Sequence, residues 1–168
     1  GPVLGITRVA VPAEVTTPEM EDQLAQVGAD LLVDVITQIG ERKQIEIPQD
    51  EREASYAKKF EKNDGRIDWR KPAAKIQNFV RALIPYPCAF TFLAGKQRIV
   101  IHKVKGTRYP SKPDHRPGAI LSVDKESFKV ACADGDVTIL ELQPENKRRM
   151  SAAEFINGYQ PKPGQFFS

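Results

Sequence analysis

The first long apolar pattern of the chain lies in residues 17–40, where hydrophobic side chains recur at three- and four-residue steps. The stripe consists of Met20, Leu24, Val27, Leu31, Val35 and Ile39. This spacing puts the apolar side chains on one face and predicts an amphipathic helix. Thr17 is expected to cap its start, Pro18 suits the first helical position, and Gly40 ends it.

The residues before this helix form a short β-rich run over 3–12, which Pro12 closes. A strand is expected there. One strand and one amphipathic helix cannot enclose a core by themselves. Residues 1–40 are therefore interpreted as the last piece of an α/β layer whose remainder is absent.

A polar, mixed-charge stretch follows at 41–65 and is interpreted as a linker that crosses the surface with a few ordered turns. A second helix opens at Lys71–Pro72. Its apolar stripe consists of Ile76, Phe79, Val80 and Leu83, and Pro85 and Pro87 stop it.

After Pro87 the apolar period changes to two, which is typical of strands. Turn signals at Gly95–Lys96, at 124–126 and at 134–136 divide residues 88–143 into five short strands. A long connection over 105–118 separates the second strand from the third. Five strands at near-regular spacing favour a small antiparallel barrel of the oligonucleotide-binding type. Ser151 and Glu154 have the spacing of a capping box, which predicts a short terminal helix.

Composition adds the class of protein and the distribution of charge. Of the 168 residues, 40% are hydrophobic and 28% charged, which describes a soluble globular protein, and no apolar run approaches the length of a membrane span. No signal peptide is recognisable. Cys88 and Cys132 form neither a disulfide framework nor a metal-ligand motif, which suggests buried thiols in a reducing compartment.

The net charge of +3 conceals an asymmetry between the two ends of the chain. Residues 1–65 hold 7 Lys and Arg against 13 Asp and Glu, a balance of −6, whereas residues 66–168 hold 18 against 9, a balance of +9. This division indicates two structural units and a polyanionic partner for the second.

The residues that usually carry catalysis are isolated in this sequence. His102 and His115 have no nucleophile or carboxylate partner nearby, so no catalytic residue is expected. Asp134 and Asp136 flank Gly135 in an expected hairpin turn, where short carboxylates stabilise the turn, and no metal site is expected. Trp69 is expected to pack under the second helix rather than stack on a base.

The candidate binding residues are cations. Lys103 and Lys105 alternate with Val104, so both side chains should project from one strand face. Cations just ahead of a helix start add to its attraction for anions. The full candidate set for a nucleic-acid backbone is Lys58, Lys59, Lys62, Arg81, Lys96, Arg98, Lys103, Lys105, Arg108, Lys147, Arg148 and Arg149. We expect these side chains to line one groove that grips a structured RNA by its shape, because few exposed aromatics accompany them.

Three segments, in order and with matching spacing, resemble the carboxy-terminal half of methionyl-tRNA formyltransferases. They are "PQDEREASYAKKFEKNDGRIDW", "FVRALIPYPCAFTF" and "ADGDVTILELQPENKRRMSAAEFINGY". "GPVLGITRVAVP" and the helix after it resemble the tail of that family's formyltransferase domain. Cys88 departs from the family pattern, since relatives often have glycine there, and this puts the geometry of that turn in doubt.

The resemblance implies an α+β chain in three parts: a Rossmann-like remnant of the catalytic domain at 1–40, a linker at 41–65, and a tRNA-binding barrel of five to six strands with flanking helices at 66–168. It also implies that the full enzyme transfers a formyl group from formyl-tetrahydrofolate to the methionine amino group of initiator tRNA. The family's catalytic Asn, His and Asp are absent, so the chain alone is expected to be inactive and to bind no cofactor.

The expected partners are initiator methionyl-tRNA and the missing amino-terminal formyltransferase domain, and no membrane. A monomer in the bacterial cytoplasm is expected, with an organelle as the alternative compartment. Two other functions stay open: the corresponding domain of a sugar formyltransferase or formyl-tetrahydrofolate hydrolase, and a non-catalytic RNA-binding adaptor. Those enzyme relatives have less reason for a strongly basic second half.

Overall fold

The computed structural model describes residues 1–109 and 115–168, and its contacts divide the chain into two compact units, Gly1–Lys59 and Phe60–Ser168. The expected long connection over 105–118 therefore lies partly outside the described residues. Residues 60–65, expected in the linker, are grouped with the second unit. The three-part division at 40/41 and 65/66 stays a prediction.

The first unit is built around α1 (Thr17–Gly40), whose bounds match the expected helix. Its cap is Thr16 and not Thr17. The backbone N–H and the hydroxyl of Thr16 both donate to Glu19 Oε2, at 2.8 and 2.7 Å. The expectation was wrong by one position because a capping box needs an acidic side chain three residues on, and that spacing joins Thr16 to Glu19, whereas Thr17 would face Met20.

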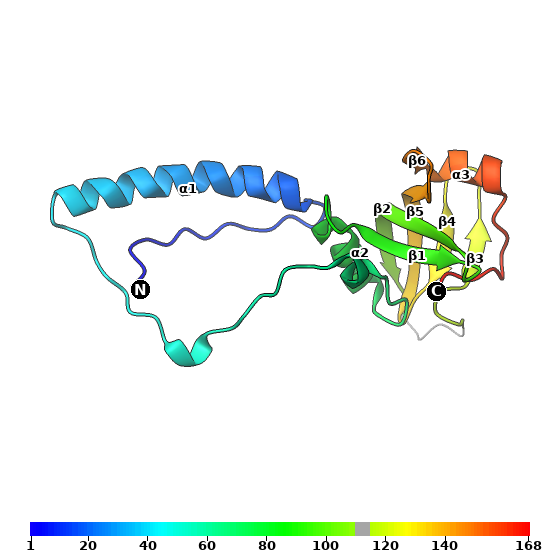
Figure 1. Ribbon diagram of the computed structural model, residues 1–168, viewed down its shortest axis with the longest axis horizontal. Helices are drawn as coiled ribbons and strands as arrows, with labels where there is room; N and C mark the ends of the chain where they lie inside the picture. The colour runs from blue at the N-terminus through cyan, green and yellow to red at the C-terminus, as the bar shows by residue number, and fades with distance from the viewer. Residues whose placement is uncertain (110–114) are drawn as a thin grey trace. The chain divides into compact units, whose positions relative to one another are not determined.

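Residues 3–12 do not form a strand. The only pairing found in this segment, among the described residues, is a single bridge in which Val3 and Ile47 exchange backbone hydrogen bonds of 2.8 and 2.9 Å. The segment instead runs alongside α1, where Gly5 lies against Leu31 and Val35 (Figure 1). A β-rich sequence becomes a strand only where a neighbour supplies a ladder of backbone partners, and in residues 1–59 the structure supplies a single bridge instead of a ladder.

The second unit contains an antiparallel sheet of six strands, joined in the order β1-β2-β5-β4-β3, with β6 paired to β5. The strands are β1 (Ala89–Leu93), β2 (Gln97–Arg108), β3 (Ile120–Val123), β4 (Phe128–Ala131), β5 (Gly135–Pro144) and β6 (Met150–Ser151). The five expected strands are confirmed, and β6 adds the sixth of the expected five to six. The predicted turns at Gly95–Lys96 and at 124–126 join β1 to β2 and β3 to β4.

Two helices complete the core of this unit from different sides of the strands (Figure 1). In α2 (Ala73–Ala82) the side chains of Ile76 and Val80 are buried, and in α3 (Ala152–Tyr159) Phe155 is buried. All three belong to one hydrophobic cluster with the inner side chains of the sheet. A short 3-10 turn, η2 (Lys62–Gly65), leads into this unit.

Trp69 lies in the same core, as expected. Only 4% of its surface is exposed, its indole N–H donates to the hydroxyl of Thr91 at 3.0 Å, and its ring lies 6.0 Å from that of Phe167. A ring enclosed in this way has no free face for a nucleotide base. The alternative role for Trp69, base stacking, is thereby excluded.

The C-terminal segment connects the two edge strands of the sheet. Phe92 of β1 exchanges backbone hydrogen bonds of 3.0 Å with Ser168, while Phe167 N–H donates to Gly118 O at 2.8 Å on the β3 side. Gly118 has φ +91°, and a Cβ on it would lie 2.3 Å from the Phe167 carbonyl oxygen. The strand order β1-β2-β5-β4-β3 does not close on itself, and the C-terminal segment forms backbone hydrogen bonds at both ends of this order.

Candidate nucleic-acid interface

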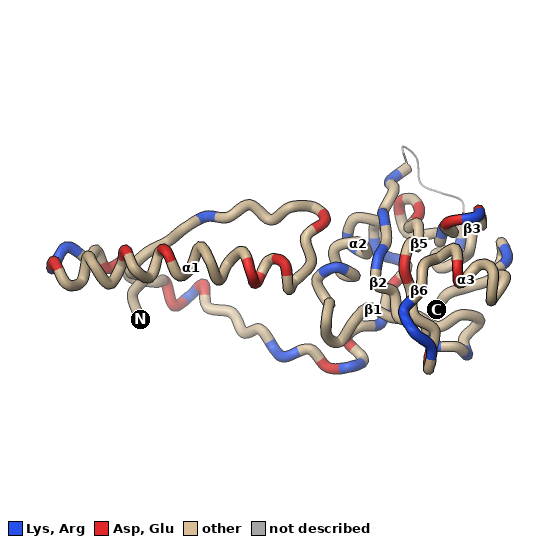
Figure 2. Tube along the Cα trace, turned by 90° about the horizontal axis from the view of Figure 1, so that it is seen from above, with Lys and Arg blue, Asp and Glu red and all other residues tan. Residues whose placement is uncertain are grey.

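The outer face of the sheet is the side turned away from the core, and β2 presents two lysines there. Lys103 and Lys105 are exposed, while Val104 between them is 5% exposed and packs inward. This confirms the alternation expected from the sequence. Figure 2 shows Lys and Arg positions along β2 and beside β6, with acidic positions between them.

The three consecutive cations before α3 do not act alike. Arg148 Nη2 lies 2.6 Å from Glu154 Oε1, Arg149 Nε donates to Glu141 Oε2 at 2.8 Å, and Lys147 forms no ion pair within the described part of the chain. These pairs are solvent-exposed, so water and salt weaken them and a phosphate can compete for the cation.

The expected capping box of α3 is present and acts on the charge of Glu154. Ser151 N–H donates to Glu154 Oε2 at 2.9 Å, and Glu154 N–H donates to Ser151 Oγ at 3.2 Å. The pKa of Glu154 lies below its ordinary value. The larger cause is the hydrogen bond from Ser151 N–H to its carboxylate, and the next is the hydrogen bond from Arg148. Glu154 is therefore fully ionised at neutral pH, and it holds Arg148 at the start of the helix.

Two arginines far apart in the sequence converge near Cys88. Burial raises the pKa of the Cys88 thiol, and the nearby charges of Arg98 and Arg149 partly oppose that rise. The guanidinium carbon of Arg98 lies 4.2 Å from the ring centre of Phe90. Cys88 itself has φ +59°, a left-handed conformation that glycine adopts without strain. This answers the doubt about that turn, because the cysteine keeps a glycine-like backbone.

His102 lies near Arg149 and is largely neutral at neutral pH. Burial lowers its pKa, and its Nε2 lies 3.1 Å from Gln143 Oε1. His115 is exposed.

The other predicted contact residues are distributed over the rest of the chain. Arg81 Nε donates to Asn78 Oδ1 at 2.9 Å on α2, and Arg108 Nε lies 3.9 Å from Asp134 Oδ2. Lys62 and Lys96 are exposed in η2 and in the β1–β2 turn, whereas Lys58 and Lys59 belong to the first unit. That all twelve cations contact nucleic acid stays a prediction.

The expectation that both aspartates serve a hairpin turn is wrong for Asp136. Asp136 is completely buried at the start of β5, where its Oδ2 accepts a 2.5 Å hydrogen bond from the Tyr109 hydroxyl and lies 3.6 Å from Lys129 Nζ. This hydrogen bond raises the pKa of Tyr109 to about 12. Asp134 caps α2 instead, accepting a hydrogen bond of 2.8 Å from Ala73 N–H.

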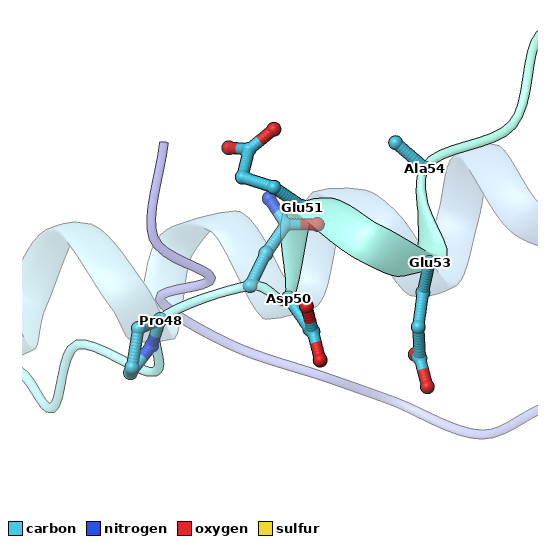
Figure 3. Close-up of a pocket in the computed structure, with 6 residues that line it drawn as sticks. Pro48, Asp50, Glu51, Glu53 and Ala54 are labelled. Atoms are coloured by element: carbon cyan, nitrogen blue, oxygen red, sulfur yellow. The ribbon is translucent and has the colours of Figure 1, made fainter.

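Two hollows of the surface differ in charge. One, of about 600 Å³, lies in the first unit between Pro48 and Ala54, and Figure 3 shows that Asp50, Glu51 and Glu53 line it. Such an acidic hollow repels a phosphate backbone. The other, of about 470 Å³ in the second unit, is lined by Arg66, Asp68, Lys71, Pro72, Lys75 and Phe79. Sequence reasoning included none of these cations among the contact residues, since Lys71 and Lys75 flank the start of α2 and Arg66 follows η2, outside any charge run.

Lys129 was also missed, although the sequence signals its position. It lies between Phe128 and Val130, both completely buried, so strand alternation places it on the outer face.

In the part of the chain that the structure describes, no three His, Cys, Asp or Glu side chains gather closely enough to hold a metal ion. None of its described helices combines the length and apolar character that a membrane crossing requires.

The fold and this surface define a class, an α+β domain whose antiparallel sheet carries cations on its outer face. Residues 59–160 match the family model of the formyl transferase C-terminal domain, and the chain belongs to that family. It corresponds to the C-terminal portion of methionyl-tRNA formyltransferases. The enzyme of that name from Carboxydothermus hydrogenoformans is 40% identical over 95% of this chain, and that from Symbiobacterium thermophilum is 36% identical over all of it.

The chain spans about half the length of these relatives, 51% of each. A solved structure with a similar fold is a variant of HypX from Aquifex aeolicus, with a TM-score of 0.62 at 15% identity over 94% of this chain and 28% of HypX. At that identity the likeness concerns the fold alone.

Proposed function

We propose that this chain is the tRNA-binding part of a methionyl-tRNA formyltransferase of the bacterial cytoplasm. The whole enzyme would transfer a formyl group from formyl-tetrahydrofolate to the methionine amino group of initiator tRNA, at the start of translation. The observation that carries the proposal is the joint presence of family membership and a basic second unit. Residues 60–168 hold 19 Lys and Arg against 11 Asp and Glu, a net charge of +8.

A charge of this size attracts polyanions through the release of counterions, and such contacts give affinity rather than sequence choice. The lysines of β2 and the cations beside β6 supply backbone contacts from a rigid sheet. The core of this unit encloses Trp69, Phe90, Phe128, Phe155 and Phe167, while Phe60 and Tyr86 are exposed. A surface with so few exposed rings favours a structured RNA over a single strand stacked on rings.

The sheet itself supports the finer proposal of a small barrel of the oligonucleotide-binding type. Residues 166–168 pair with Phe92–Ala94 at the end of β1, and residues 164–167 pair with residues 118–120 at the start of β3, so a continuous circuit of backbone pairing runs through the C-terminal segment. Closing a sheet in this way removes its free edges.

The first unit supports a Rossmann-like remnant that needs its preceding domain. No residue of α1 is buried, and Leu32, Val33 and Ile36 are 57%, 63% and 58% exposed. An apolar helix face of this kind is typical of a surface that packs against another element. Catalysis and formyl-tetrahydrofolate would belong to that domain, and the isolated chain would neither bind the folate nor turn over.

A binding titration tests the tRNA contact. Labelled initiator tRNA is titrated with the chain at several salt concentrations; about five phosphate contacts give a slope of log affinity against log salt near −4. Replacing Lys147, Arg148 and Arg149 by Ala should reduce that slope by about 3. Replacing Arg8, Lys43 and Arg52 of the first unit removes the same charge and serves as the control. A flat salt response would refute the electrostatic interface.

A turnover assay tests whether catalysis requires the missing formyltransferase half. The purified chain with formyl-tetrahydrofolate and charged tRNA should give no formyl-methionyl product, and added formyltransferase half should restore it. Product from the chain alone contradicts the proposal. An RNA-binding adaptor would bind tRNA without any such rescue, and a sugar formyltransferase domain would show no tRNA affinity.

A further inference from the structure

A row of three polar side chains crosses the outer face of the sheet. Lys105 of β2 lies directly opposite Thr138 of β5, and Thr138 lies directly opposite Lys129 of β4. Residues opposite each other on neighbouring strands project to the same side. Neighbouring strands are about 4.8 Å apart, so the two lysine backbones are roughly 10 Å apart with the threonine hydroxyl between them.

The side on which the row lies is fixed by burial. The neighbours of Thr138 along β5, Val137 and Ile139, are completely buried, as are Phe128 and Val130 around Lys129. The side chains of the row must therefore project away from the core. Lys105 is exposed, and the Lys129 side chain is 42% exposed, so both ammonium groups reach solvent.

The charges around the row leave it net positive. Lys129 faces the buried Asp136 at 3.6 Å, and Arg149 neutralises Glu141, which lies opposite Lys103. Lys103 and Lys105 form no ion pair within residues 1–109 and 115–168. Among the described residues, Lys103 and Lys105 thus have no carboxylate partner, and Lys105 belongs to the row.

We infer that Lys105, Thr138 and Lys129 form a phosphate-binding site on the outer face of β2, β5 and β4, which takes a backbone phosphate of the bound RNA. Lys105 supplies an ammonium group, Lys129 supplies a second one that also faces Asp136, and the Thr138 hydroxyl supplies a directed hydrogen bond. The site has no aromatic member, so it contacts the backbone and not a base. The RNA source rests on the proposed function, whereas the phosphate chemistry does not.

The test uses single variants of the full chain in the tRNA titration. Lys105→Ala and Lys129→Ala should each lower the salt slope by about one, as the loss of one phosphate contact does. Thr138→Val keeps the branched shape and removes the hydroxyl, so affinity should fall severalfold with the slope unchanged. Lys162→Ala, in the exposed segment after α3, removes the same charge as the lysine variants and should change neither quantity.

A second readout separates the site from the function. Inorganic phosphate at millimolar concentration should shift the backbone amide resonances of Lys105, Thr138 and Lys129 in the folded chain. If tRNA binds but the row variants behave like Lys162→Ala, the inference is overturned and the proposed function stands. If tRNA does not bind but phosphate shifts those resonances, the site stands and its RNA source fails. If neither occurs, both fail.

Discussion

The hydrogen bond between Tyr109 and Asp136 provides a direct test of how the second unit is held together. The carboxylate of Asp136 is completely buried; its Oδ2 accepts the Tyr109 hydroxyl at 2.5 Å, and within the described residues its Oδ1 has no hydrogen-bond partner. Among the described residues, Tyr109 supplies the one hydroxyl that donates to this carboxylate; Tyr109→Phe removes it and leaves Lys129, at 3.6 Å, as a polar neighbour.

The expected cost follows from leaving a buried charge short of a donor. Hydrogen bonds to charged groups contribute about 1.5–3 kcal/mol, so Tyr109→Phe should lower the free energy of unfolding by that amount near neutral pH. The pKa of Tyr109 is raised to about 12 in the folded chain from an ordinary value near 10. A raised pKa means that the stabilisation is complete below the ordinary pKa and is lost as the pH rises toward the folded value.

Urea unfolding of both proteins, near neutral pH and at increasingly alkaline pH, measures this effect. The difference between wild type and variant should be largest near neutrality and shrink once the pH exceeds about 10. Near-ultraviolet absorbance should show one late-titrating tyrosine among the four in the wild type, absent from the variant. Tyr56→Phe is the control, since Tyr56 is fully exposed. Equal unfolding midpoints for Tyr109→Phe and wild type would show that this hydrogen bond does not stabilise the fold.

Three further predictions concern the second unit. Gly118→Ala should lower the free energy of unfolding by about 2 kcal/mol or more, because its Cβ meets the Phe167 carbonyl at positive φ. Gly158→Ala, in open space on α3, should be neutral or stabilise by up to about 1 kcal/mol, and equal effects of the two in urea unfolding would contradict this account. Ser151→Ala should cost about 1 kcal/mol in the same assay through the lost cap. Because the pKa of Glu154 is lowered in the folded chain, the stability that its carboxylate contributes should disappear as the pH falls through that pKa. The free energies of unfolding of wild type and Glu154→Gln, measured at decreasing pH, should converge there.

Periodic patterns in the sequence were sufficient to predict several helices and strands of this protein. The three- and four-residue steps from Met20 to Ile39 specified α1, because a helix displays that spacing as one face. The alternation after Pro87 specified the strands, and the Ser151–Glu154 spacing specified the start of α3. The sequence also determined the basic character of the second unit and the family, since charge and ordered motifs are properties of the chain alone.

Features that depend on neighbours distant in the chain could be seen only in the folded protein. Residues 3–12 are β-rich yet form no strand, because strand formation requires an adjacent ladder. Asp136 reads as a turn residue but is buried beneath Tyr109, and Trp69 is enclosed by the C-terminal segment. The row of Lys105, Thr138 and Lys129 exists only through the register of three strands. Pattern along a chain fixes which side of an element faces the core, whereas pairing between strands fixes which exposed side chains meet.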